Sequence, residues 1–274
     1  MKILSTLLLS SSIVLSASSQ THQLNKLWET GDLAVPESVL PDLKEKILYT
    51  SLIDGSGTGV DGKGGVAKVS LDGKIIDASW ITGLNAPKGL ARHGNKLYVA
   101  DLTELVVVDI RAGKIDRKIP VQGSVFLNDV AVDSKGIAYV SDTRTAKVHR
   151  IVNNKAELWL DNVAGANGLK FIGDDLYILS DTKLIKAKKN KEISTVASGF
   201  AKSGDGIEPL QNGDYIVTCW SGLIYYVYKD GRTELLLDTQ GQGLNTADLG
   251  IDPAKNIIYI PTFNKNSIIA FQLK

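Results

Sequence analysis

Residues 127–142 read LNDVAVDSKGIAYVSD, and this stretch decides the fold class. Two short runs rich in β-branched residues flank a polar turn at residues 133–136. Asp and Gly in that turn allow the backbone dihedral angles that tight hairpins require. The stretch therefore predicts a β-hairpin, and its second strand carries Tyr139.

The same pattern returns along the chain at intervals of about forty residues. A second pair of short strands around a polar turn, such as the turn at residues 153–155, follows each hairpin. Four short strands per unit are typical of a propeller blade, and six units fit the length of the chain. The tyrosines that mark the units are Tyr49, Tyr98, Tyr139, Tyr177, Tyr215 and Tyr259.

We therefore predict an all-β protein with a single domain, a six-bladed β-propeller over residues 20–274. Residues 267–273 supply only a third strand to the last blade, and residues 25–29 are expected to supply the fourth. Pairing of the two ends would close the ring and cover sheet edges that would otherwise be exposed. No helical period is found after the first residues.

Residues 1–19 have the layout of a secretory signal peptide, with a short positive start, an apolar stretch and small residues before cleavage at Ala17 or Ser19. The apolar stretch is too short for a membrane span. We expect an exported protein, periplasmic or secreted, with no membrane insertion.

Charge argues against two classes of partner. The chain has 31 basic and 30 acidic residues, and loss of Lys2 with the leader leaves 31 − 1 = 30 of each. A neutral balance provides no electrostatic attraction to nucleic acid or to an anionic membrane. A small molecule is the expected partner, and the sequence names no protein partner.

One position in each unit falls just before a predicted inner strand, at the mouth of the central channel; we term it the channel-mouth position. Closure of the ring would bring the side chains at this position together. Two carboxylates and two amides, without histidine or cysteine, match the oxygen ligands of calcium. The sequence thus predicts a site for Ca²⁺, or another hard divalent cation, formed by Glu37, Asn128, Asn167 and Asp205.

A purely structural reading of these residues stays open, because Asn-Asp, Asn-Gly and Asp-Gly are common turn dipeptides. The shared position favours the metal site, since the hairpin turns have their own polar clusters five to eight residues later. Lys88 and Ala247 occupy the channel-mouth position in the other two units. An ammonium there would repel a cation unless it turns aside, so Lys88 is a candidate for holding a substrate carboxylate.

The chain resembles the regucalcin, gluconolactonase and luciferin-regenerating-enzyme (senescence marker protein) family, within the calcium-dependent six-bladed propellers that include paraoxonases. The resemblance rests on Asn128-Asp129, residues 167–171, Asp205-Gly206 and the early Glu37. It implies that Glu37, Asn167 and Asp205 bind the metal and that Asn128 is a further ligand or a substrate contact. It also implies that Asp205 is the base or nucleophile in hydrolysis of a lactone or related ester.

The chain departs from the family pattern in three places. Residues 36–38 read Pro-Glu-Ser where the family has Glu-Gly-Pro, Phe126 replaces an arginine, and Gly204 replaces a proline. Loss of the arginine affects recognition of a sugar lactone but not of the metal. A non-catalytic propeller that binds a ligand or protein, as NHL-repeat propellers do, is the alternative function. Such a module could keep the turn residues without any affinity for calcium.

Two further motifs are assigned structural roles. Residues 57–64 resemble a nucleotide-binding P-loop, but Gly64 replaces the required Ser or Thr and a strand is expected to follow. We interpret residues 55–65 as a flexible glycine-rich loop. Cys219, the single cysteine, cannot form an internal disulfide and is expected to be a small buried hydrophobe beside Trp220.

Histidine chemistry lacks its components, because no histidine shares the channel-mouth position; the three are His22, His93 and His149. This argues against a Ser-His-Asp triad and a histidine zinc site. Trp80, Trp159 and Trp220 are expected to pack within or between blades.

Overall fold

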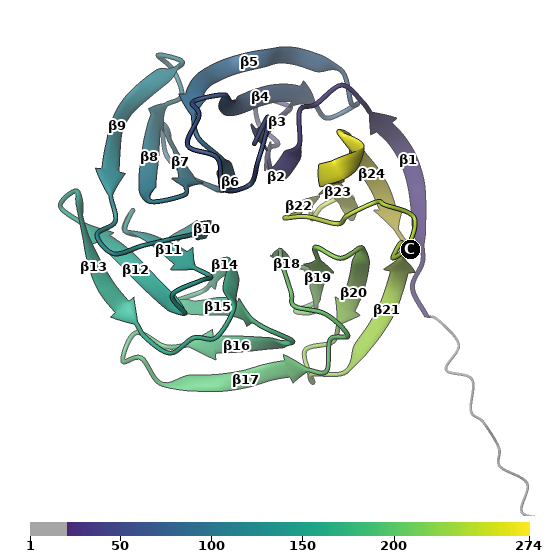
Figure 1. Cartoon of the computed structure of the whole chain (residues 1–274). Helices are drawn as coiled ribbons and strands as arrows, with labels where there is room; N and C mark the ends of the chain where they lie inside the picture. The colour runs from purple at the N-terminus through teal and green to yellow at the C-terminus, as the bar shows by residue number, and fades with distance from the viewer. Residues whose placement is uncertain (1–20) are drawn as a thin grey trace, which may run out of the picture.

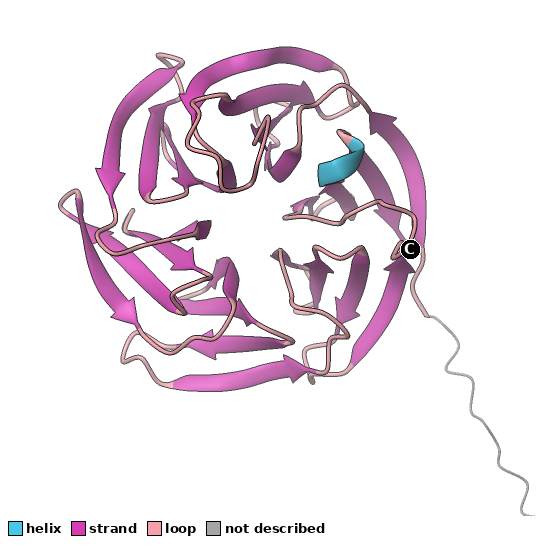
Figure 2. Cartoon of the chain, in the orientation of Figure 1, coloured by secondary structure: helices cyan, strands magenta, loops and turns pink. Residues whose placement is uncertain are grey.

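The computed structural model describes residues 21–274, so the leader predicted over residues 1–19 lies outside the described part of the chain. Six four-stranded antiparallel sheets surround one axis (Figure 1). Figure 2 shows strands and loops with one short helical turn, the 3₁₀ helix η1 (Phe263–Lys265). No helix in residues 21–274 has the length and hydropathy needed to cross a membrane. The predicted six-bladed β-propeller is confirmed.

Each of the first five blades takes four consecutive strands, from the axis outward. Blade 1 contains β2 (Pro36–Asp42), β3 (Ile47–Leu52), β4 (Gly64–Ser70) and β5 (Ile75–Leu84). Blade 2 contains β6 (Pro87–His93), β7 (Lys96–Asp101), β8 (Glu104–Asp109) and β9 (Lys114–Pro120). Blade 3 contains β10 (Leu127–Val132), β11 (Ala138–Asp142), β12 (Lys147–Val152) and β13 (Lys155–Leu160).

The second half of the ring repeats this order. Blade 4 contains β14 (Ala166–Ile172), β15 (Asp175–Ser180), β16 (Lys183–Ala187) and β17 (Ile193–Ser198). Blade 5 contains β18 (Ile207–Pro209), β19 (Tyr215–Cys219), β20 (Leu223–Val227) and β21 (Thr233–Asp238). Blade 6 contains β22 (Gly250–Asp252), β23 (Ile257–Pro261), β24 (Ile268–Leu273) and, as its outer strand, β1 (Leu24–Thr30).

Blade 6 joins the two ends of the described chain. Strand β1 runs antiparallel to β24, with Leu24 opposite Leu273. Backbone hydrogen bonds of 2.9 and 3.0 Å between Gln23 and Lys274 extend the pairing. The expected closure by residues 25–29 is confirmed, and it covers the edge of β24 that would otherwise be exposed.

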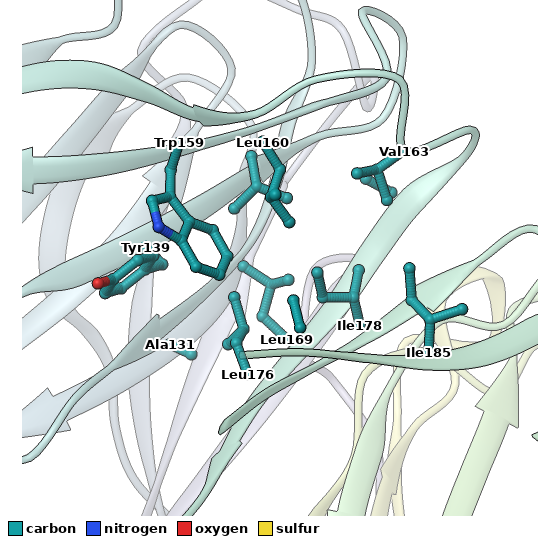
Figure 3. Packing of buried hydrophobic residues seen from close by; sticks show 12 residues of the cluster. Ala131, Tyr139, Trp159, Leu160, Val163, Leu169, Leu176, Ile178 and Ile185 are labelled. Atoms are coloured by element: carbon teal, nitrogen blue, oxygen red, sulfur yellow. The ribbon is translucent and has the colours of Figure 1, made fainter. Parts of the chain in front are cut away.

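The apolar core is divided among the interfaces between blades. Figure 3 shows the cluster between blades 3 and 4, where the rings of Tyr139 and Trp159 lie 4.9 Å apart. Trp80 packs similarly, 5.0 Å from the ring of Tyr49. The packing role expected for Trp80 and Trp159 is confirmed.

The expectation for Trp220 was wrong. Its side chain is 45% exposed, and its ring contacts that of Phe263 at 5.4 Å. Trp220 follows the last residue of β19, so it lies in a connection at the rim of the ring rather than within a sheet. A residue in that place has no blade on either side to cover it.

Blade 5 also departs from the tyrosine register. In blades 1 to 4 the tyrosine directly precedes the residue that pairs with the inner strand two positions after the channel-mouth position. In blade 5, Ile207 pairs with Val217, so Ile216 takes the place of the tyrosine. A shift of one residue reverses the face of the sheet. Tyr215 therefore packs toward blade 4, where its ring lies 5.5 Å from that of Tyr177.

Candidate functional site at the channel mouth

The inner strands of four blades have a register shift at the channel-mouth position. In β10, Leu127 pairs with Asp142 and pairing resumes only at Val130, so Asn128 and Asp129 lie in a bulge. Strands β2, β6 and β14 have the same shift around Glu37, Lys88 and Asn167. A bulge interrupts the regular alternation of side chains and often re-aims one of them at a functional site.

Hydroxyl groups on the second strands stabilise these bulges. Ser141 Oγ accepts a 2.9 Å hydrogen bond from the N–H of Asp129, and Thr218 Oγ1 accepts one of 2.9 Å from Gly206. Ser51 acts in the same way in blade 1. The buried backbone groups that the bulge removes from the ladder are therefore satisfied, as buried N–H groups must be.

The structure brings Glu37, Asn167 and Asp205 together. Asn167 Nδ2 donates a 2.6 Å hydrogen bond to Asp205 Oδ1, and Glu37 and Asp205 are each 4% exposed. Glu37 Oε2 and Asp205 Oδ2 are buried, and no described residue hydrogen-bonds to either atom. Two buried carboxylate oxygens without a partner are unfavourable unless a proton or a cation compensates them.

Asn128 is held so that its amide oxygen stays available. Its Nδ2 donates to Thr143 Oγ1 at 3.0 Å, and that hydroxyl donates to the carbonyl oxygen of Ala166 at 2.7 Å. Because the single hydroxyl proton of Thr143 is used by Ala166, Thr143 can only accept from the NH₂ group of Asn128. The assigned amide orientation therefore leaves Asn128 Oδ1 without a protein donor.

Burial raises the pKa of both carboxyl groups at this site. It raises the pKa of Asp205 to about 7, and the hydrogen bond from Asn167 opposes it only in part. Burial also raises the pKa of Glu37 well above its ordinary value, and the nearby charge of Asp205 adds to the increase, while the charge of Lys88 opposes it. A cation between the two carboxylates would compensate the same negative charge that protons compensate in its absence.

Asp129 and Asp248 belong to the same charged cluster, although the sequence did not assign them to the site. Asp129 Oδ2 accepts from the N–H of Leu169 at 2.6 Å, and Asp248 Oδ2 accepts from Ser38 Oγ at 2.5 Å. Burial is the main cause that raises the pKa of Asp129 to about 7 and that of Asp248 well above its usual range. An acidic residue one place after the channel-mouth position, in two of the six units, was the signal that could have identified them.

Lys88 turns aside from the carboxylates, as the metal hypothesis required. Its Nζ donates to the carbonyl oxygen of Ala86 at 2.8 Å and lies 4.4 Å from the ring centroid of Phe126. Among the described residues no carboxylate lies within 4.0 Å of Nζ. Burial lowers the pKa of Lys88, and the charges of Glu37 and Asp101 oppose that effect.

The oxygen donors present fit a hard cation. In residues 21–274 no group of three or more His, Cys, Asp or Glu side chains is arranged to hold a metal ion. The candidate set instead combines two carboxylates, Glu37 and Asp205, with the amides of Asn128 and Asn167. Calcium accepts such mixed oxygen sets together with water. Of the predicted residues, Glu37, Asn167 and Asp205 have evidence for direct proximity, and Asn128 has evidence for orientation.

A cavity of about 180 Å³ lies farther along the channel. Asp129 and Asp248 line it beside Lys170 and Glu208, whose Nζ and Oε1 atoms form a 2.6 Å ion pair. The axis of the propeller is therefore charged along its length, and acidic side chains outnumber basic ones.

The other residues singled out from the sequence lie away from this site. His22 stacks on Tyr226 with ring centroids 3.8 Å apart, His93 ends β6, and His149 lies in β12. Cys219 is fully buried, and burial raises the pKa of its thiol to about 12, which confirms its expected inert role. Strand β4 begins at Gly64, so no helix follows the glycine-rich loop and a P-loop is excluded.

Comparisons by sequence find no relative: no family model matches the chain, and no curated protein matches it. Solved structures do match by shape. A streptogramin B lyase superposes with a TM-score of 0.66 at 12% identity, covering 92% of this chain and 97% of that one. A virginiamycin B lyase from Staphylococcus aureus gives 0.65 at 14% identity, with 92% and 99% covered.

A third similar structure is a catalytically inactive histidine-to-alanine variant of the S. aureus virginiamycin B lyase, solved with quinupristin. Its TM-score is 0.62 at 14% identity, and the match covers 92% of this chain and 99% of that chain. Identities this low show that the fold is shared and nothing more about this chain.

Proposed function

We propose that this protein is an exported hydrolase of lactones or related esters that uses a hard divalent cation, Ca²⁺, at the channel mouth. The observation that carries the proposal is the pair of buried carboxylate oxygens, Glu37 Oε2 and Asp205 Oδ2, that no protein group satisfies. Likeness in fold to lyases, one of them solved with quinupristin, supports an enzyme that acts on a small molecule.

Glu37, Asn128, Asn167 and Asp205 would hold the cation. When bound, it would polarise the carbonyl group of the substrate as a Lewis acid. Asp205 would accept a proton from the attacking water, because a base with a pKa of about 7 matches neutral conditions. The water oxygen then bonds to the acyl carbon, the bond from that carbon to the alkoxy oxygen breaks, and the alcohol leaves with a proton. Asn167 occupies Asp205 Oδ1, which leaves Oδ2 for this work.

A carboxylate base distinguishes this chemistry from that of a propeller that needs a histidine. The similar S. aureus lyase includes an inactive variant that lacks one histidine. In this chain His22, His93 and His149 all lie outside the channel-mouth cluster. Asp205 is therefore the side chain of the cluster best suited to proton transfer.

A second candidate function is ligand binding without catalysis. The observation in its favour is that Glu37, Lys88 and Asp205 are at most 4% exposed, so substrate access requires a rearrangement above them. A binding module with this cluster would carry protons on its carboxyl groups rather than a cation. Affinity for calcium separates the two candidates.

The thermal midpoint of residues 20–274, measured in EDTA and then in excess Ca²⁺, tests the metal site. A ligand at 100 times its dissociation constant stabilises a protein by about 2.7 kcal/mol, which corresponds to roughly 5–10 °C here. We expect that shift in the native protein and in the control Asp174→Ala, whose side chain is exposed on a hairpin. Asp205→Ala should lose it. An equal shift in both variants would refute the assignment of Asp205.

Hydrolysis is tested separately by proton release from a panel of aliphatic and aromatic lactones in a pH-stat. We expect Ca²⁺-dependent turnover that Asp205→Asn abolishes and Asp174→Ala retains. If calcium binds but no lactone or ester in the panel is turned over, the binding propeller becomes the better description.

A further inference from the structure

A pair of cations flanks one aromatic ring at the channel mouth. Lys88 Nζ lies 4.4 Å from the ring centroid of Phe126, and the guanidinium carbon of Arg144 lies 4.6 Å from the same centroid. Phe126 stands where the resembling family has an arginine, so the positive charge is supplied here by residues from two other elements. Lys88 comes from β6 and Arg144 from the connection between β11 and β12.

Neither cation has an anionic partner among residues 21–274. Lys88 is 3% exposed, and its one hydrogen bond is to the carbonyl oxygen of Ala86, which leaves two of its three donor hydrogens unused. Arg144 is exposed and forms neither a hydrogen bond nor an ion pair with any described residue. Ordered positive groups that are not neutralised by the protein are available to an external anion.

The ring between them is held rigidly. The N–H of Phe126 donates to Asp142 Oδ1 at 3.0 Å, and its carbonyl oxygen accepts from the N–H of Thr143 at 3.1 Å. Both partners belong to the segment that leads directly to Arg144. The ring and the guanidinium are therefore positioned by the same short stretch, which reduces the entropy lost when a ligand binds.

We propose that Lys88 and Arg144 bind a carboxylate group of the substrate, which restricts the substrate class to lactones or esters that also carry a carboxylate. This step rests on the proposed function. The charge of Glu37 is the nearest compensation for Lys88, and a cation on Glu37 would remove that compensation. Lys88 would then be a buried ammonium without a counter-charge, and a substrate carboxylate would supply one. The planar guanidinium of Arg144 suits a carboxylate because it can donate two parallel hydrogen bonds.

A merely structural role makes a different prediction. Cations stabilise themselves on aromatic rings without any ligand, and removal of such a contact changes stability alone. Recognition of a carboxylate instead changes the preference between a charged ligand and a neutral ligand of the same shape. The test therefore compares para-fluorophenylacetate with para-fluorophenylacetamide, titrated into residues 20–274 in Ca²⁺ and followed by fluorine NMR.

We expect the native protein to bind the carboxylate probe about fivefold or more tightly than the amide, in line with a charge-assisted contact that is partly exposed. Arg144→Gln and Lys88→Met should each reduce that preference toward unity while the affinity for the amide stays the same. The matched control is Arg117→Gln, since Arg117 is an exposed arginine that already pairs with Asp116. It should keep the native preference.

Equal affinity for the two probes in the native protein overturns the proposal, and so does a preference that both variants retain. Failure to bind the carboxylate probe at all has the same meaning. None of these readings depends on hydrolysis. A preference lost in Arg144→Gln, without a calcium-induced shift in midpoint, would sustain the anion site and refute the metal-dependent hydrolase. A calcium shift without carboxylate preference would do the reverse.

Discussion

At the scale of single residues, the proposed site depends on which oxygen each side chain leaves free. Asn167 uses its NH₂ group on Asp205, and Asn128 uses its own on Thr143. Each amide thereby keeps a carbonyl oxygen that has no protein donor. Groups that orient ligands in this way commonly affect metal affinity almost as much as the ligands do.

Thr143→Val removes the hydroxyl that orients Asn128 and keeps the side-chain shape. We expect the dissociation constant for Ca²⁺ to rise about tenfold, because the amide is then free to flip and present its NH₂ group. Calorimetric titration measures the change. Thr145→Val is the matched control: it lies in the same connection, and its buried hydroxyl has no hydrogen-bond partner. Equal affinities for the two variants would exclude the orienting role of Thr143.

At the scale of elements, bulges and glycines allow the inner strands to approach one another around the axis. Gly89, directly after Lys88, faces Asp129 of the next blade. A Cβ atom added at Gly89 would lie 2.0 Å from Asp129 Oδ1 and 2.5 Å from its Cα atom. The contact involves backbone as well as side chain, so the two strands would have to separate. This close approach holds Asp129 in the buried cluster.

Gly89→Ala should therefore destabilise the protein by about 1–3 kcal/mol through overpacking. Urea unfolding followed by tryptophan fluorescence measures the loss. Gly57→Ala provides the comparison, because a Cβ atom there meets nothing within 4 Å and its backbone does not need a positive φ. Its effect should stay within about 0.5 kcal/mol. A Gly89 variant as stable as the Gly57 variant would show that the inner strands have room to spare.

At the scale of the whole molecule, the ring is held closed by more than β1. Glu234 in β21 of blade 5 accepts hydrogen bonds from the backbone of Thr21 and His22, from His22 Nδ1 and from the hydroxyl of Tyr228. The N-terminal residues before β1 are thus fastened to the neighbouring blade. Because β1 belongs to blade 6, this contact joins blades 5 and 6 at the place where the chain closes.

Glu234→Gln should weaken closure in a pH-dependent way. Burial tends to raise the pKa of Glu234, but its hydrogen bonds, led by that from His22, lower it to about 2. A carboxyl group with a folded pKa below its unfolded value contributes stability above the unfolded pKa, and that contribution disappears as the pH falls from about 4.5 to 2. We expect a loss on the order of 1–2 kcal/mol at pH 7 that shrinks toward zero near pH 2.

Urea unfolding at pH 7 and pH 2.5 measures that difference between the native protein and the variant. Glu157→Gln is the control, since Glu157 forms an exposed pair with Arg150 on the outer strands of blade 3. A constant difference at both pH values would mean that the ionised form of Glu234 is not what fastens the N-terminal residues.

The sequence by itself determined the blades, their number, the closure of the ring and the position that carries the candidate ligands. These features depend on short windows: alternating strands, turn residues and a repeat of about forty residues are all local. The burial of Cys219 and the packing of Trp80 and Trp159 could be predicted for the same reason. The register of Tyr215 could not, because strand pairing and not composition sets which face a residue occupies.

The tertiary structure alone decided which side chains meet. Asp129 and Asp248 share a buried cluster although they are 119 positions apart (248 − 129) and belong to blades 3 and 6. Arg144 reaches the ring of Phe126 only because Asp142 folds the connection back on itself. Contacts of this kind depend on where bulges redirect the backbone and how closely the blades approach. Those distances follow from the closed ring as a whole, and no local stretch of sequence encodes them.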